Sequence, residues 1–150
     1  MKKLFLLTIL SAVAIFSFAQ SDREVEWVFT SKKIADKTYE VRMTANINGD
    51  YHIYAQDGGD GPVSTTFNFK KSPLLVLDDK VKEIGKLKNV YEDAFKSQVK
   101  YFEETVTFVQ VVKLKGNAKT NLAGSVEFMV CNDHECLPPA TVNFRVSIGG

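Results

Sequence analysis

The most reactive residues of this sequence lie together in one short segment. Cys131 and Cys136 are the only cysteines of the chain, and the four residues Asn132-Asp133-His134-Glu135 separate them. A cysteine pair can form a stable disulfide, cycle between dithiol and disulfide, or supply soft ligands to a metal ion. A disulfide of either kind needs the two sulfur atoms close together, so the elements around the segment decide whether it forms.

The sequence predicts a β-hairpin at this pair. Alternating apolar and polar residues indicate a strand over residues 125–131, and a turn sequence with two prolines follows at 137–139. Four residues between two strand ends are enough for a hairpin loop. The residues that flank such a loop face each other at Cα distances near 5.5 Å, which a disulfide can span.

Spacing alone leaves three interpretations of the pair open. A structural staple in a non-redox binding module would stabilise little, because closing a loop of six residues returns only about 2 kcal/mol of chain entropy. A metal site could use Cys131, His134 and Cys136, but a closed site needs a fourth ligand, and the sequence has no second cluster of cysteine and histidine. A redox pair at an exposed loop would exchange with the thiols of other proteins.

The rest of the chain also favours strands. Apolar and polar residues alternate without exception over residues 39–47. Further runs predict strands at 25–29, 51–55, 63–69, 74–77, 99–114 (two strands or a bent one) and 141–148. The only segment that could be helical spans residues 89–100, and it lacks an apolar stripe. Seven or eight short strands indicate an all-β, immunoglobulin-like antiparallel β-sandwich, with an up-and-down barrel as the alternative.

The sequence of the amino terminus is typical of a targeting segment. Lys2 and Lys3 precede an apolar run from Leu4 to Phe18, and small residues follow. This pattern predicts a signal peptide over residues 1–19, cleaved after Ala19, and one mature domain over residues 20–150. We therefore expect a protein of the periplasm, where disulfides persist.

Composition excludes several classes of function. The 150 residues are 45% hydrophobic and 25% charged, as in one globular domain, and 19 basic against 18 acidic residues give a net charge of +1. A nearly neutral chain lacks the positive field that draws proteins to nucleic acid, so no nucleic-acid partner is expected. We also expect no small-molecule cofactor and no resident metal ion.

Residues 130–139 resemble the active-site hairpin of the amino-terminal periplasmic domain of DsbD, the thiol:disulfide interchange protein of Gram-negative bacteria. The shared motif is a cysteine pair followed by an apolar residue and two prolines. Residues 48–54 resemble the strand rich in Gly and Tyr beside that family's active site, and residues 91–95 resemble its cap loop. The resemblance covers essentially the whole mature chain.

The resemblance implies an immunoglobulin-like domain that relays electrons as a thiol–disulfide oxidoreductase. Cys136 would form mixed disulfides with thioredoxin-like periplasmic proteins, and Cys131 would be the resolving thiol. Phe95 would cap the bridge, with Asp93 at the acidic position of the cap loop. The remaining residues expected to line the site are His52, Tyr54 and His134.

The sequence also departs from the family pattern. The loop between the cysteines is one residue shorter than in the best-known members, and Ala94 stands where some members carry an acidic residue. The sequence includes neither a transmembrane donor domain nor a thioredoxin-like domain. We therefore expect a free-standing version whose electron donor is a separate membrane protein.

Overall fold

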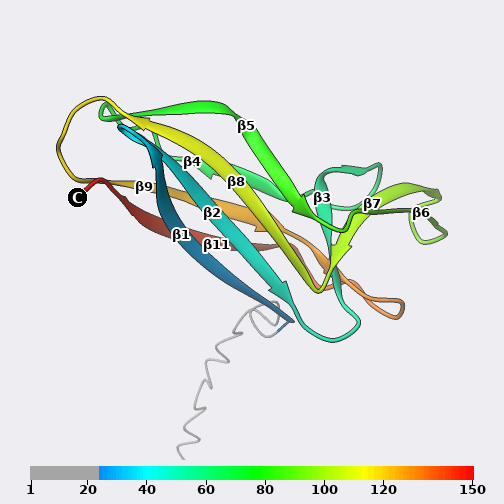
Figure 1. Ribbon diagram of the computed structural model, residues 1–150. Helices are drawn as coiled ribbons and strands as arrows, with labels where there is room; N and C mark the ends of the chain where they lie inside the picture. The colour runs from blue at the N-terminus through cyan, green and yellow to red at the C-terminus, as the bar shows by residue number, and fades with distance from the viewer. Residues whose placement is uncertain (1–23) are drawn as a thin grey trace, which may run out of the picture.

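Figure 1 shows the computed structural model, which describes residues 24–150. The expected signal peptide and its cleavage point lie outside these residues. Within 24–150 the chain forms eleven strands: β1 (Val25–Ala35), β2 (Thr38–Ile47), β3 (His52–Gly59), β4 (Thr66–Phe69), β5 (Leu75–Gly85), β6 (Lys88–Glu92), β7 (Ser97–Glu103), β8 (Thr105–Leu114), β9 (Thr120–Phe128), β10 (Val130–Cys131) and β11 (Ala140–Ile148). No helix of this described part is long and apolar enough to cross a membrane.

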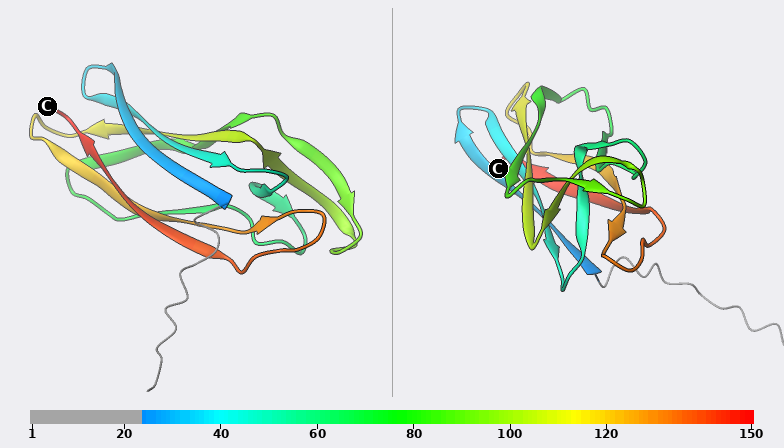
Figure 2. Two further views of the ribbon diagram at one scale, coloured as in Figure 1. Left: turned by 90° about the horizontal axis from the view of Figure 1, so that it is seen from below. Right: turned by 90° about the vertical axis from the view of Figure 1, so that its right-hand side faces the viewer.

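The strands form three antiparallel sheets. Their orders are β1-β2-β8-β5, β11-β9-β4 and β10-β3-β7-β6. Side chains of the first two sheets meet in one main core, which makes these sheets the two layers of a sandwich (Figure 2). The predicted immunoglobulin-like β-sandwich is therefore confirmed.

The alternation of residues 39–47 fixes which side of β2 faces the core. Val41, Met43 and Ala45 are fully buried, whereas the residues between them are partly exposed. Aromatic side chains fill much of the remaining space, and the ring of Trp27 lies 5.4 Å from that of Phe128, centroid to centroid. Rings at this distance add to the energy of burial. Most phenylalanines of residues 24–150 lie in the main core or pack against it.

The segment 89–100, considered as a helix candidate, is a β-hairpin instead. Strands β6 and β7 pair with Val90 opposite Val99, and the turn between them contains Lys96 at φ 53°. The apolar residues of this segment recur across the hairpin rather than along one side of a helix, so pairing buries them and a helix would not.

The structure decides one alternative that the sequence left open and extends one expected strand. Residues 99–114 form two strands, because the chain turns at Glu104, where φ is 61°. The strand expected at 74–77 continues to Gly85 as β5, past a bulge at Asp79 with φ 62°. Both breaks occur at a polar residue in the left-handed region, which a polarity pattern does not reveal.

The third sheet lies at the end of the sandwich that is far from the C-terminus (Figures 1 and 2). One of its faces sends Ile53 and Phe102 into the main core. The opposite face carries His52, Tyr54 and Tyr101, whose rings contact one another. The two cysteines join this sheet through β10, so the fold brings the residues of the β3 strand and of the cysteine segment together.

Candidate functional site

Cys131 and Cys136 face each other across a hairpin and are joined by a disulfide. Their Sγ atoms are 2.05 Å apart and their Cα atoms 4.1 Å apart. The facing arrangement expected from the sequence is confirmed, at a Cα distance shorter than the expected 5.5 Å. The pair occupies a position without hydrogen bonds between its own two residues, and such positions bring Cα atoms closer, to roughly 4.5 Å.

The hairpin has hydrogen bonds of its own that do not involve the bridge. The N–H of Asn132 donates to the Glu135 carbonyl at 2.9 Å, and the N–H of Leu137 donates to the Val130 carbonyl at 2.8 Å. The Oδ1 atom of Asn132 accepts the N–H groups of His134 and Glu135, both at 2.9 Å. Because these bonds already shape the loop, the bridge is not needed to form it.

The two halves of the bridge have different surroundings. Cys131 is 1% exposed and packs with Tyr54, Val99 and Met129 in a small apolar cluster apart from the main core. We call these four residues the bridge cluster. Cys136 is exposed on the other strand of the hairpin. An incoming thiol can therefore reach Cys136 directly, whereas Cys131 is covered by its neighbours.

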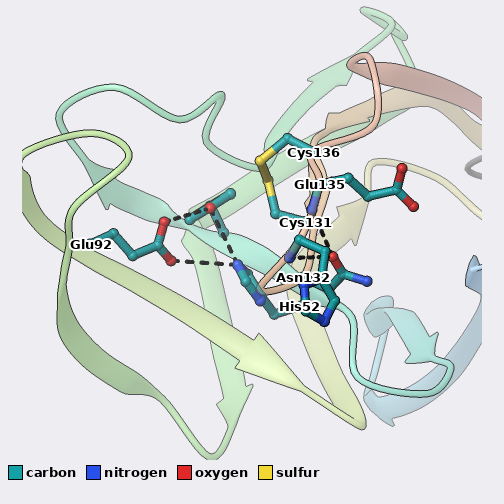
Figure 3. The surroundings of a disulfide bond; sticks show 8 residues. His52, Glu92, Cys131, Asn132, Glu135 and Cys136 are labelled. Carbon is teal, nitrogen blue, oxygen red and sulfur yellow. Dashed lines mark hydrogen bonds and ion pairs between the residues drawn. A yellow bond between two sulfur atoms is a disulfide. The ribbon is translucent and has the colours of Figure 1, made fainter.

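Strand β3 places a chain of polar groups next to Cys131. His52 lies directly opposite Cys131 in the β3–β10 pair. Its Nε2 atom is 3.2 Å from the Tyr54 hydroxyl, which donates to Oε2 of Glu92 at 3.2 Å. The hydroxyl has one proton and gives it to Glu92, so the Nε2–H of His52 must be the donor to Tyr54. Figure 3 shows His52 on β3 and Glu92 on β6, the strands on either side of β7.

Burial controls the charge state of this polar chain. Desolvation lowers the pKa of His52 below its ordinary 6.5; Glu103 and Asp133 oppose this shift and Lys88 adds to it. Glu92 Oε1 lies 3.6 Å from Nε2, but burial is the larger effect, so the ring is neutral at pH 7. Burial, and then the charge of Glu92, raise the pKa of Tyr54.

The β6–β7 hairpin places Phe95 against the bridge cluster. The ring of Phe95 meets that of Tyr54 edge to face, with centroids 6.0 Å apart. Gly61 allows this close approach, since a Cβ atom there would lie 2.6 Å from Cδ1 of Phe95. Phe95 thus packs against the bridge cluster, which contains Cys131, while Cys136 stays exposed.

A hollow of about 410 Å³ opens between two hairpins. One is the β6–β7 hairpin, which we call the cap hairpin, and the other carries Cys131 and Cys136 and is called the cysteine hairpin. Its lining consists of His52, Val90, Tyr91, Glu92, Asp93, Ala94, Tyr101, Asn132 and Asp133. The structure therefore places Asp93 and His52 at one opening, together with two residues of the loop between the cysteines. His134 is exposed on the hairpin and does not line the hollow.

The metal interpretation needs the sulfur atoms of Cys131 and Cys136 as free ligands. Both sulfur atoms are used in the bridge. Within residues 24–150 no group of three or more His, Cys, Asp and Glu side chains is arranged to hold a metal ion.

A comparison of the sequence with family models identifies the family of the chain. The family model "Thiol:disulfide interchange protein DsbD, N-terminal" matches residues 20–148. The chain belongs to the DsbD N-terminal domain family. No curated protein matches the sequence significantly.

Two solved structures of periplasmic or DsbD domains share the fold. The reduced N-terminal domain of DsbD from Neisseria meningitidis aligns with a TM-score of 0.56 at 15% identity, over 86% of this chain and 89% of that one. The N-terminal periplasmic domain of ScsB from Proteus mirabilis aligns with a TM-score of 0.53 at 12% identity, over 83% of this chain and 44% of that one. At these identities the likeness establishes the sandwich and no more.

Two residues of this DsbD-family site were missed by sequence reasoning. Glu92 accepts the Tyr54 hydroxyl, and Tyr101 stacks on His52 with ring centroids 4.2 Å apart. Residues 88–92 show no alternation of apolar and polar residues that would have indicated this strand.

Proposed function

We propose that this domain is a periplasmic thiol–disulfide interchange domain that relays electrons through Cys131 and Cys136. It accepts them from a membrane donor and passes them to thioredoxin-like proteins. Membership in the DsbD family supports this function. The structural observation that carries it is the asymmetry of the bridge, with Cys136 exposed and Cys131 buried. A purely structural bridge has no need of one reachable sulfur.

In the discharge reaction the reduced domain gives two electrons to a partner disulfide. The Cys136 thiolate attacks one partner sulfur, forming a mixed disulfide and releasing the other partner sulfur as a thiolate. Cys131 then loses its proton and attacks the Sγ of Cys136. The Cys131–Cys136 bond forms, the bond to the partner breaks, and the partner leaves as a dithiol.

Loading is the reverse reaction with a donor dithiol. A donor thiolate attacks the exposed Sγ of Cys136, and the electron pair of the broken bridge goes to Cys131, which takes up a proton. The second donor thiol then attacks the donor sulfur of the mixed disulfide. Cys136 is released as a thiolate, and the donor leaves oxidised.

The other expected site residues have supporting roles in this proposal. Phe95 keeps solvent and unrelated thiols from Cys131, because its ring packs on the bridge cluster. His52 and Tyr54 lie on the strand next to Cys131 and contact each other there. Asp93 lines the hollow, where a partner would dock. We assign no chemical step to His134, which is exposed and contributes only its backbone N–H to the loop.

Trapping of mixed disulfides tests this function. A Cys131→Ser variant cannot resolve a mixed disulfide, so it should capture a thioredoxin-like protein through Cys136 in a periplasmic extract. The matched Cys136→Ser variant has only the buried thiol and should capture little. If neither variant, or both equally, formed adducts that dithiothreitol releases, the relay would be excluded and a binding module with a structural disulfide would be the better account.

A further inference from the structure

The proposed reaction creates a proton problem at Cys131. Its thiol must lose a proton when the bridge closes and gain one when the bridge is reduced. Cys131 is 1% exposed and lies among apolar side chains. Solvent cannot take up the proton there, and forming an isolated thiolate costs free energy. A neighbouring group that accepts and returns the proton would remove this cost.

His52 is the titratable side chain best placed for this transfer. It is the direct partner of Cys131 across the β3–β10 pair, and directly opposed residues have Cβ atoms about 4.5–5.5 Å apart on the same face of a sheet. The bridge partner Cys136 lies directly opposite Cys131 on its other side. Cys131 therefore lies between the sulfur that it attacks and an imidazole.

The tautomer of His52 leaves a basic nitrogen available. Nε2 carries the hydrogen that is donated to Tyr54, so Nδ1 carries the lone pair. Nδ1 makes no hydrogen bond within residues 24–150. The ring also lines the hollow between the two hairpins, which gives a proton a way out to solvent.

The surrounding charges allow His52 to become an imidazolium briefly. Glu92 on β6 lies 3.6 Å from Nε2, and Glu103 on β7 and Asp133 on the cysteine hairpin also favour the charged ring. Lys88 on β6 opposes it, but its ammonium is paired with Glu103 at 2.5 Å. The other titratable neighbours are the phenols of Tyr54 and Tyr101, which stay protonated because burial raises their pKa values.

We propose that His52 takes the proton of Cys131 when the bridge closes and returns it when the bridge is reduced. In closure the Cys131 proton passes to Nδ1, the Cys131 sulfur attacks Cys136, the partner thiolate leaves, and the imidazolium then releases its proton into the hollow. This inference rests on the proposed relay. It adds a role that the family match does not assign to any residue.

Glutathione disulfide is a suitable probe, because its reaction with the reduced domain separates the two steps. Glutathione first becomes attached to Cys136, and the bridge then closes with release of glutathione; acid quenching and mass spectrometry follow both species. In a His52→Gln variant we expect the attachment step to stay within about twofold of wild type. Closure should slow by roughly 100-fold, the lower end for loss of a general base, so the glutathione adduct accumulates.

His134 provides the matched control, since it is the only other histidine of the chain and lies on the hairpin itself. A His134→Gln variant should close the bridge at the wild-type rate. Imidazole added to a His52→Ala variant should restore part of the closure rate, because the base can enter the hollow. A structural defect would not respond to imidazole, so slow closure without rescue would overturn the proposal.

The wild-type protein gives a test that does not depend on any variant folding. Its closure rate should rise with pH through an inflection below pH 6.5, where His52 loses its proton. A rate that rises only in the range of ordinary thiol ionisation, above about pH 8, would contradict the role of His52. If glutathione never attaches to Cys136, the relay itself fails. If it attaches and closure is equally fast in His52→Gln, only the role of His52 fails.

Discussion

Cys131 and Cys136 share one bond but occupy opposite environments. The first lies in an apolar cluster at 1% exposure and is paired with His52, whereas the second lies exposed across the hairpin. Three features of the proposed relay follow from this difference. Partners attack at Cys136, the buried Cys131 thiol needs a proton acceptor, and Phe95 shields only the side of Cys131.

The reduced domain should react with small electrophiles at Cys136 first. With a limiting amount of iodoacetamide at neutral pH, we expect Cys136 to be modified at least about tenfold faster than Cys131, because the latter is buried. Peptide mapping by mass spectrometry measures the ratio. Equal modification in the folded protein would mean that the reduced site does not keep the asymmetry of the bridged one.

Reducing the bridge should leave the sandwich folded. Because the loop has its own hydrogen bonds and the bridge closes only six residues, reduction should lower the free energy of unfolding by about 2 kcal/mol. Urea denaturation with and without dithiothreitol measures the difference. A Cys131→Ala/Cys136→Ala variant is the control and should not respond to the reductant. Unfolding upon reduction would instead identify the bridge as a staple.

Moving Phe95 should expose the bridge cluster. Gly61 has φ of 111°, and a Cβ atom there would lie 2.6 Å from Phe95 Cδ1, so Gly61→Ala should displace the ring and destabilise the fold by roughly 1–3 kcal/mol. Reduction of the bridge by dithiothreitol should become faster. Gly116→Ala is the matched control, since nothing lies within 4 Å of the added atom. An unchanged rate in a folded Gly61→Ala protein would argue against Phe95 as a cap.

The stability of the domain should fall as the pH drops below 6.5. The folded protein lowers the pKa of His52, so in this range the unfolded chain binds more protons than the folded one, and the free energy of unfolding decreases with falling pH. Urea denaturation at pH 7.5 and pH 5.5 should show the decrease. In His52→Gln the decrease should be smaller; an equal decrease would place its origin in other groups.

The sequence was sufficient for the parts of the fold that repeat locally. The alternation of residues 39–47 predicted both the strand and its buried face, and the cysteine spacing predicted a hairpin with facing sulfurs. Each of these features depends on residues a few positions apart, where the period of a strand is visible.

The hydrogen-bonded series His52–Tyr54–Glu92 could not be predicted in the same way, because it depends on pairing between strands that are distant in the sequence. Tyr54 and Glu92 are 38 residues apart, and they meet only because β3 and β6 flank the same strand, β7. A bulge between Tyr54 and Gly59 shifts that register. No local pattern specifies either feature, so the carboxylate that binds Tyr54 became evident only in the structure.

The reduction potential of the Cys131–Cys136 bridge tests the central claim most directly. It is measured by equilibrating the purified domain with dithiothreitol redox buffers and quantifying the free thiols. A bridge that exchanges electrons with thioredoxin-like proteins should have a potential above about −300 mV, within reach of such partners. A bridge that stays intact in buffers well below that value would be structural, and the proposed relay would be wrong.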